Sequence, residues 1–330
     1  MNGGRSPARA LVALVIVGAL AVACGDAFAA SISLSTRPVA LDPTDRAVQH
    51  VGRLHYLGGL DLRSAEPAFG GLSGLSVTGG GRLTAVTDRG HWFSARVVRD
   101  RTGRLTDLAD AALGPLLDTK GHPVAGEWRD AEALERLPGG DWLVSFEGRH
   151  RVWRYAAETG GLQGRPAPFP TPKGIAAAPP NGGLEALTPL PDGRILMLAE
   201  SLKRTGGSRA GWLVGDGTVD AFGYRTARDF KPTDAAVLPN GDVLVLSRYF
   251  KLLGGFKARL ERISAGANGG GAVPKGELLA RFAPPLTVDN YEGVAVARDA
   301  DGATLVYILS DDNFHFLQRT LLLLFRLDQS

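Results

Sequence analysis

Five segments of the chain carry polar side chains at matching places in a shared pattern. The position just before the first pair of small apolar residues holds Ser73, Glu132, Glu185, Asp234 and Glu292. A second position, at the end of the next apolar run, holds Asp88, Glu147, Glu200, Arg248 and Asp311. If eight carboxylates and one guanidinium converge, they require either raised pKa values or a bound cation.

Carboxylate oxygens are the ligands that Ca²⁺ prefers in proteins, with Mg²⁺ and Mn²⁺ next. We therefore predict a Ca²⁺ site made by Glu132, Glu185, Asp234 and Glu292. Four further oxygen donors are candidates to complete the coordination: Asp130, Asn181, Asn290 and Asp312. The six His residues show no ligand spacing, which disfavours zinc. The alternative is that the acids are structural, capping backbone amides or pairing with Arg and Lys.

Basic residues follow the same segments: Arg89, Arg149, Lys203, Arg204, Lys231, Arg248 and Lys251. A phosphate-bearing substrate needs such donors beside a metal ion. We predict Arg89, Lys203 and Arg248 as substrate-binding residues, with solvation or pairing with the acids as the alternative for each. Glu147 or Glu200, whose pKa neighbouring acids would raise, is the predicted proton shuttle.

The segments that carry these residues are repeats of one unit. They cover residues 71–88, 130–147, 183–200, 232–248 and 291–311, and each reads as a strand, a Gly-rich turn and a more apolar strand. Successive units start 49 to 59 residues apart, which is the size of a four-stranded propeller blade. The sequence predicts an all-β fold, a β-propeller of five visible units with five or six blades, over a β-sandwich or β-solenoid.

A strand-like stretch precedes the first unit and has no hairpin partner. Residues 51–62 are expected to join the last blade, closing the ring and removing exposed sheet edges. Residues 105–117 are expected to hold a short helix. We assign residues 30–50 to an N-terminal extension and residues 51–330 to a single propeller domain.

The N-terminus has the pattern of an export signal over residues 1–29, with Arg5 and Arg9 before an apolar run and an Ala-Phe-Ala end. A free periplasmic protein is expected; the alternative is a lipid anchor on Cys24, which ends a permissive lipobox. No later apolar run is long enough to span a membrane. The single Cys excludes an internal disulfide, and the net charge of +3 gives no case for nucleic-acid binding.

Several of these stretches resemble the bacterial phytase-like family, often labelled "esterase-like activity of phytase". The likeness lies in GGLSGLSV at 70–77, AVTDRGHWF at 85–93, DAEAL at 130–134, NGGLEAL at 181–187, DFKPTDAAVLPNGDVLVLSRYF at 229–250, DNYEGVAV at 289–296 and SDDNF at 310–314. The resemblance implies an exported propeller. The family label derives from distant similarity to calcium-dependent propeller phytases, and it supplies no defined catalytic set for this chain.

Two functions are compatible with the sequence. The first is a metal-dependent hydrolase of phosphoesters or related esters, acting on a small anionic or ester substrate at the mouth of the propeller channel. The second is a non-catalytic propeller that binds a ligand or protein at the cell envelope, with the acids structural or holding an ion for rigidity.

Overall fold

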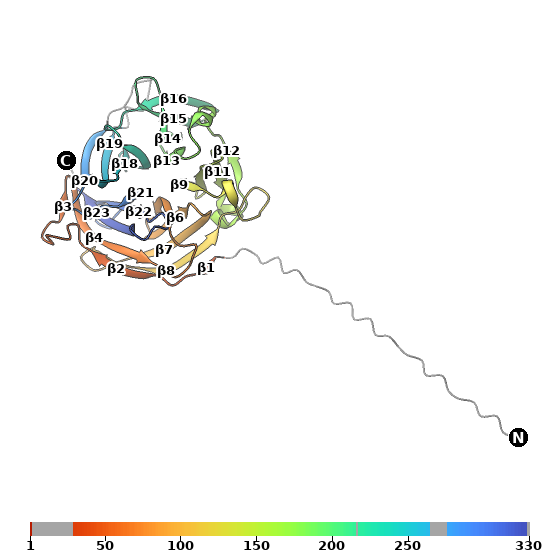
Figure 1. Ribbon diagram of the computed structural model, residues 1–330, viewed down its shortest axis with the longest axis horizontal. Coiled ribbons are helices and arrows are strands. Elements are labelled where there is room, and N and C mark those ends of the chain that lie inside the picture. The colour runs from red at the N-terminus through yellow and green to blue at the C-terminus, as the bar shows by residue number, and fades with distance from the viewer. Residues whose placement is uncertain (2–28, 216, 265–275, 329–330) are drawn as a thin grey trace.

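The computed structural model describes residue 1 and residues 29–215, 217–264 and 276–328. Cys24 and all but the two ends of the predicted export signal lie outside these ranges. The described chain folds into five antiparallel sheets arranged as a ring (Figure 1). The propeller predicted from the repeats is confirmed, with five blades.

The blades are numbered here in chain order, each written from its inner strand outward. Blade one contains β5 (Leu72–Val77), β6 (Arg82–Thr87), β7 (His91–Arg99), β8 (Leu105–Pro115) and β1 (Ala30–Ser31). Blade two contains β9 (Ala131–Arg136), β10 (Trp142–Phe146), β11 (Arg151–Tyr155) and β12 (Ala167–Phe169). Blade three contains β13 (Leu184–Pro189), β14 (Ile195–Lys203), β15 (Arg209–Gly215) and β16 (Thr218–Tyr224).

Blade four contains β17 (Lys231–Val237), β18 (Val243–Lys251), β19 (Gly255–Ile263) and β20 (Glu277–Phe282). Blade five contains β21 (Asn290–Arg298), β22 (Thr304–Asp311), β23 (Thr320–Leu327), β4 (Leu54–Arg63) and β2 (Ser35–Val39), with β3 (His50–Val51) also on β4. Short 3-10 helices connect strands in and beside blade two: η1 (Gly126–Trp128), η2 (Ala157–Thr159), η3 (Gly161–Gln163) and η4 (Lys173–Ala177). No helix in the described ranges is long and apolar enough to cross a membrane.

The N-terminal part of the chain closes the ring. Strand β4 pairs antiparallel with the C-terminal strand β23, with Leu60 opposite Leu322. This is the closure expected for residues 51–62, and it joins the two ends of the propeller in one sheet. Residues 30–50 add outer strands to two blades, because β1 pairs with β8 and β2 with β4.

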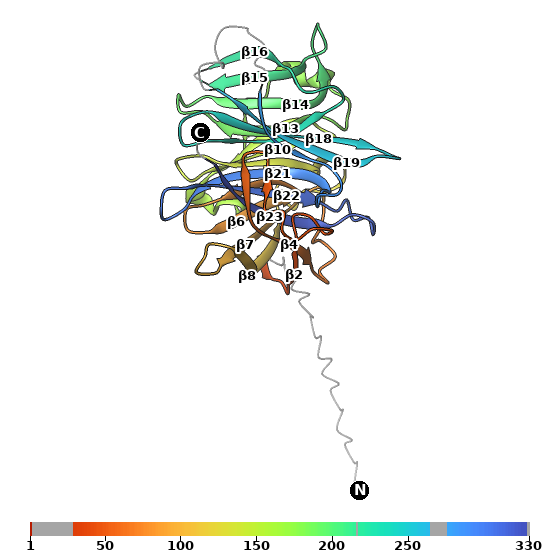
Figure 2. The ribbon, with the colours of Figure 1, turned by 90° about the vertical axis from the view of Figure 1, so that its left-hand side faces the viewer.

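Apolar side chains fill the spaces between neighbouring sheets. The second strands are buried on both faces, as in β14, where residues 195–199 are all buried. Met197 and Trp212 of blade three lie in one core cluster with Leu143 of blade two. The continuous apolar runs of the sequence thus reflect strands sandwiched between sheets. Viewed from the side, β18 and β19 extend beyond the neighbouring blades (Figure 2).

The prediction of a short helix over residues 105–117 is wrong, because Leu105–Pro115 form strand β8. The buried residues Leu105, Leu108 and Ala111 recur at a helix-like interval of three. The ladder between β7 and β8 shifts register twice, and Asp110 has a left-handed φ of 53°. Each extra residue at a bulge converts the strand interval of two into three, so these side chains still share one face.

Candidate metal centre at one mouth of the channel

A β-bulge recurs at the same level in every blade. The ladder between each inner strand and its neighbour skips one residue of the inner strand. The skipped residues are Gly74, Glu132, Glu185, Thr233 and Glu292. A bulge redirects its side chain out of the regular alternation of the strand. Three of the five bulges therefore present a glutamate at one level of the channel.

These glutamates line a cavity of about 290 Å³ at the mouth where the inner strands begin. Seven carboxylates line it: Asp88, Asp130, Glu132, Glu185, Glu200, Glu292 and Asp311. Two cations, Lys231 and Arg248, and the polar side chains of Ser73, Asn181 and Asn313 complete the wall. The predicted convergence of acids from distant parts of the chain is present for Glu132, Glu185 and Glu292.

Asp234 lies outside this wall. Its buried carboxylate accepts hydrogen bonds from the backbone N–H of Ala235 and of Val294, both at 2.8 Å. It therefore ties blade four to blade five. The bulge in blade four falls on Thr233, whose hydroxyl donates to the carbonyl of Tyr291 at 3.0 Å. Asp234 is therefore one residue away from the position that Glu132, Glu185 and Glu292 occupy in their blades. A shift of one residue turns a strand side chain to the other face of the sheet.

Glu147 is fully buried beside Asp130 and Glu132. One ligand oxygen from each of these three residues lies within 4.8 Å of the other two. Oε1 of Glu147 accepts the backbone N–H groups of Gly182, at 2.6 Å, and of Gly183. Its Oε2 has no N–H or ordinary O–H donor among the described residues. A water molecule, a proton shared with the neighbouring Glu185 carboxyl, or a metal ion would satisfy this oxygen.

On the opposite side of the cavity, basic side chains of the protein neutralise the negative charge of Glu200. Lys231 Nζ lies 2.7 Å from Glu200 Oε2, and Arg248 lies 3.2 Å from Glu200 Oε1. The hydroxyl of Ser201 also donates to Glu200, at 2.6 Å. The positive charge of the cavity wall thus comes from blade four and faces acids of blades three and five. The acids of blade two have no such partner in the cavity wall.

Burial raises the pKa values of acids in the cavity wall. The pKa values of Glu132 and Glu185 lie well above the ordinary value, first because of desolvation and then because of neighbouring carboxylates. Burial and Asp130 raise the pKa of Asp88 to about 7. Burial raises the pKa of Glu292 to about 7, although Arg248 opposes the shift. The cavity must hold protons or a cation near neutral pH.

Two of the predicted substrate-binding residues lie elsewhere. The guanidinium of Arg89 stacks on Phe314, 3.2 Å from the ring centroid, and donates to the carbonyl of Pro67 at 2.8 Å. Lys203 is exposed at the end of β14, outside the cavity wall. Arg248 lines the cavity as predicted, and Lys231 is its second cation. The sequence placed Lys231 near the mouth but could not show that its side chain points inward.

Comparison with known proteins gives the family and the fold. A search of curated protein sequences found no match. The α-L-arabinofuranosidase PaAbf62A from Podospora anserina, solved with cellotriose, has a TM-score of 0.50 and 12% identity, covering 84% of this chain and 97% of its own.

Two further solved structures have lower scores. A protein of unknown function from Dyadobacter fermentans has a TM-score of 0.44 and 13% identity, covering 91% of this chain and 94% of its own. A virginiamycin B lyase from Staphylococcus aureus has a TM-score of 0.40 and 10% identity. The match covers 86% of this chain and 87% of the lyase chain. At these identities the likenesses concern the fold alone. Residues 67–314 match the family described as "Phytase-like: Esterase-like activity of phytase", and the chain therefore belongs to this phytase-like family.

Proposed function

We propose that this protein is an exported, Ca²⁺-dependent hydrolase of phosphoesters or related esters, with the acidic cavity as its active site. The observation that carries the proposal is the buried Oε2 of Glu147, which lacks an ordinary donor and lies in the cluster with Asp130 and Glu132. Periplasmic location rests on the predicted signal over residues 1–29.

The donor set fits a hard divalent cation. Asp130 and Glu132 of the cavity wall would hold the ion together with Glu147, which lies buried beside them, and Glu185 and Asn181 of the wall are further oxygen donors. A site of oxygen ligands from several strands suits Ca²⁺, which takes six to eight ligands in flexible geometry, better than Mg²⁺ or Mn²⁺. Once bound, such an ion polarises an ester and lowers the pKa of a water molecule.

The remaining cavity residues have separate roles in this proposal. Lys231 and Arg248 face the cavity from the neutralised side, so they can bind the oxygens of an anionic substrate. Arg248 also fixes Glu200 and Glu292 through ion pairs. Asp88, with a pKa of about 7 and a buried Oδ1 that lacks a partner in the described chain, is suited to proton transfer. Glu147 is then a cation ligand, and Glu200 positions the two cations.

The test combines ion binding with turnover. Chelator treatment should lower the melting temperature and Ca²⁺ should restore it, with Glu132→Gln losing this response. The exposed Glu158→Gln is the matched control and should behave as wild type. Hydrolysis of phosphomonoesters, lactones and carboxylesters is then measured with each metal. Stabilisation by Ca²⁺ without turnover of any ester would favour the non-catalytic envelope-binding alternative. A melting temperature that neither chelator nor Ca²⁺ changes would contradict the proposed ion site.

A further inference from the structure

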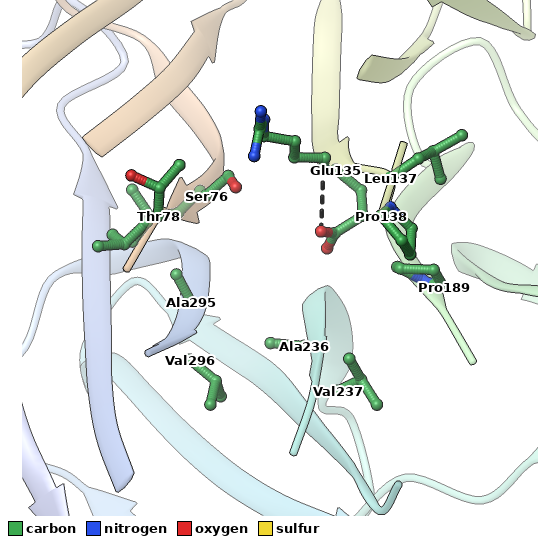
Figure 3. A pocket seen from close by; sticks show the side chains of 13 residues that line it. Ser76, Thr78, Glu135, Leu137, Pro138, Pro189, Ala236, Val237, Ala295 and Val296 are labelled. Carbon is green, nitrogen blue, oxygen red and sulfur yellow. Dashed lines mark hydrogen bonds between the residues drawn. The ribbon is translucent and has the colours of Figure 1, made fainter. Parts of the chain in front are cut away.

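A second cavity lies at the opposite mouth, where the inner strands end. It has a volume of about 300 Å³, and its wall includes the apolar side chains of Leu75, Val77, Ala236, Val237, Ala295 and Val296. Among the described residues, Glu135 carries the only carboxyl group in this wall. Figure 3 shows it directed into the space bordered by Pro138 and Ala236. Ser76, Thr78 and Arg136 also line the cavity, so this end of the channel combines mostly apolar side chains with one acid and one guanidinium, unlike the acidic mouth.

Glu135 has no cation partner in the described part of the chain. Its Oε1 accepts the backbone N–H of Arg136 at 3.0 Å, the bond drawn in Figure 3. The guanidinium of Arg136 instead lies over the ring of Trp142, 5.8 Å from its centroid. The acid nearby on β17, Asp234, is occupied by two backbone N–H groups. Burial raises the pKa of Glu135 to about 8, which reflects the missing counter-charge.

An apolar groove adjoins this cavity between blades two and three. Its volume is about 550 Å³, and it shares Leu137, Pro138 and Pro189 with the cavity around Glu135. Its further lining includes Phe169, Leu190, Ile195, Val214 and Val219. The charged side chains in the groove, Asp141 and Arg154, form an ion pair with each other. The groove thus offers apolar surface without net charge next to one carboxylate.

We propose that the two cavities form one binding site for an amphiphilic amine. The ammonium group would pair with Glu135, and an alkyl or similar apolar tail would lie in the groove past Leu137, Pro138 and Pro189. A cation supplies the counter-charge that Glu135 lacks, and the groove supplies buried apolar surface for the tail. The site is at the far end of the channel from the acidic cavity, so it does not depend on the proposed hydrolase activity.

The experiment is calorimetric titration of the full-length protein with butyl-, hexyl- and octylammonium. Saturable binding of one equivalent is expected, tightening roughly two- to fourfold with each added methylene, because a buried methylene contributes up to about 0.8 kcal/mol. Octanoate should bind at least tenfold more weakly than octylammonium, since it carries the wrong charge. Saturating Ca²⁺ should leave octylammonium binding unchanged.

Variants separate this site from the acidic mouth. Glu135→Gln should weaken octylammonium binding at least tenfold, and the half-exposed Val219→Ser should reduce the dependence on chain length. Glu158→Gln and Glu132→Gln should each bind as wild type does. The proposal is overturned if wild type shows no saturable binding, if Glu135→Gln binds normally, or if Glu132→Gln or Ca²⁺ abolishes binding, because the amine then occupies the acidic cavity. Circular dichroism of each variant confirms that the fold is intact.

Discussion

Nε of Arg248 lies 2.7 Å from Oε1 of Glu292, and this pair joins the second strand of blade four to the bulge residue of blade five. Glu292 is 5% exposed, and the same guanidinium also contacts Glu200, which is 4% exposed. One cation thus holds two buried carboxylates from different blades. The cavity depends on Arg248 for its structure as well as for anion binding.

Arg248→Met should therefore destabilise the protein by about 3 kcal/mol, because it leaves two buried carboxylates with one cation fewer. Urea unfolding in the presence of chelator measures the change. The exposed Arg228→Met is the control and should stay within ~0.5 kcal/mol of wild type. Equal stabilities of the two variants would show that the ion pairs of Arg248 contribute little.

Glu147→Gln should weaken Ca²⁺ binding at least tenfold while leaving the fold intact. The amide keeps an oxygen that can accept the N–H groups of Gly182 and Gly183, but it removes the charge of the proposed ligand. Titration calorimetry with Ca²⁺ gives the affinity, and Glu158→Gln serves as the exposed control. Wild-type affinity in Glu147→Gln would exclude Glu147 as a ligand.

Stability should fall as pH rises when the ion is absent. Burial raises the folded-state pKa values of Asp88 and Glu292 to about 7, so the folded protein binds more protons than the unfolded chain between about pH 4 and 7. Their contribution is fully present below the unfolded pKa and is lost as pH rises through 7. With chelator, the free energy of unfolding should drop by about 2 kcal/mol or more from pH 5 to pH 8.

Saturating Ca²⁺ should remove most of this pH dependence, because the ion replaces the protons. Thermal or urea unfolding at several pH values, with chelator and with Ca²⁺, measures both curves. Stability that rises with pH in the chelated protein would contradict the assigned direction of the pKa shifts.

Gly74 explains why blade one presents no glutamate at its bulge. Its φ is +57°, and a Cβ there would lie 2.4 Å from the backbone N of Leu134 in blade two. Gly74→Ala should destabilise the protein by ~2 kcal/mol or more in urea unfolding. Gly79→Ala, with open space around the added methyl, should have little effect. A tolerated Gly74→Ala would mean that the two blades can separate at this contact.

The fold could be predicted from the sequence because the same structural unit occurs five times along the chain. Five copies of a strand, a turn and an apolar strand fix the blade, and an unpartnered strand before the first copy fixes the closure through β4 and β23. The helix expected over residues 105–117 failed because bulges give a strand the interval of three, and single-sequence periodicity cannot separate that from a helical turn.

The candidate site was predicted less completely. Glu132, Glu185 and Glu292 were found because they occupy the bulge in three repeats. Asp234 was included by aligning carboxylates, whereas the bulge of blade four falls one residue earlier, on Thr233. Long side chains posed a different difficulty. Nothing in the sequence shows that Lys231 turns into the cavity while Arg89 stacks on Phe314.

The most direct test of the metal centre is an anomalous difference map from crystals grown with Ca²⁺, repeated with Mn²⁺ to strengthen the signal. We expect one strong peak in the acidic cavity, within coordination distance of carboxylate oxygens from at least two of Asp130, Glu132 and Glu147. The absence of a peak in the cavity at saturating Ca²⁺, or a peak found only on the protein surface, would contradict the assignment.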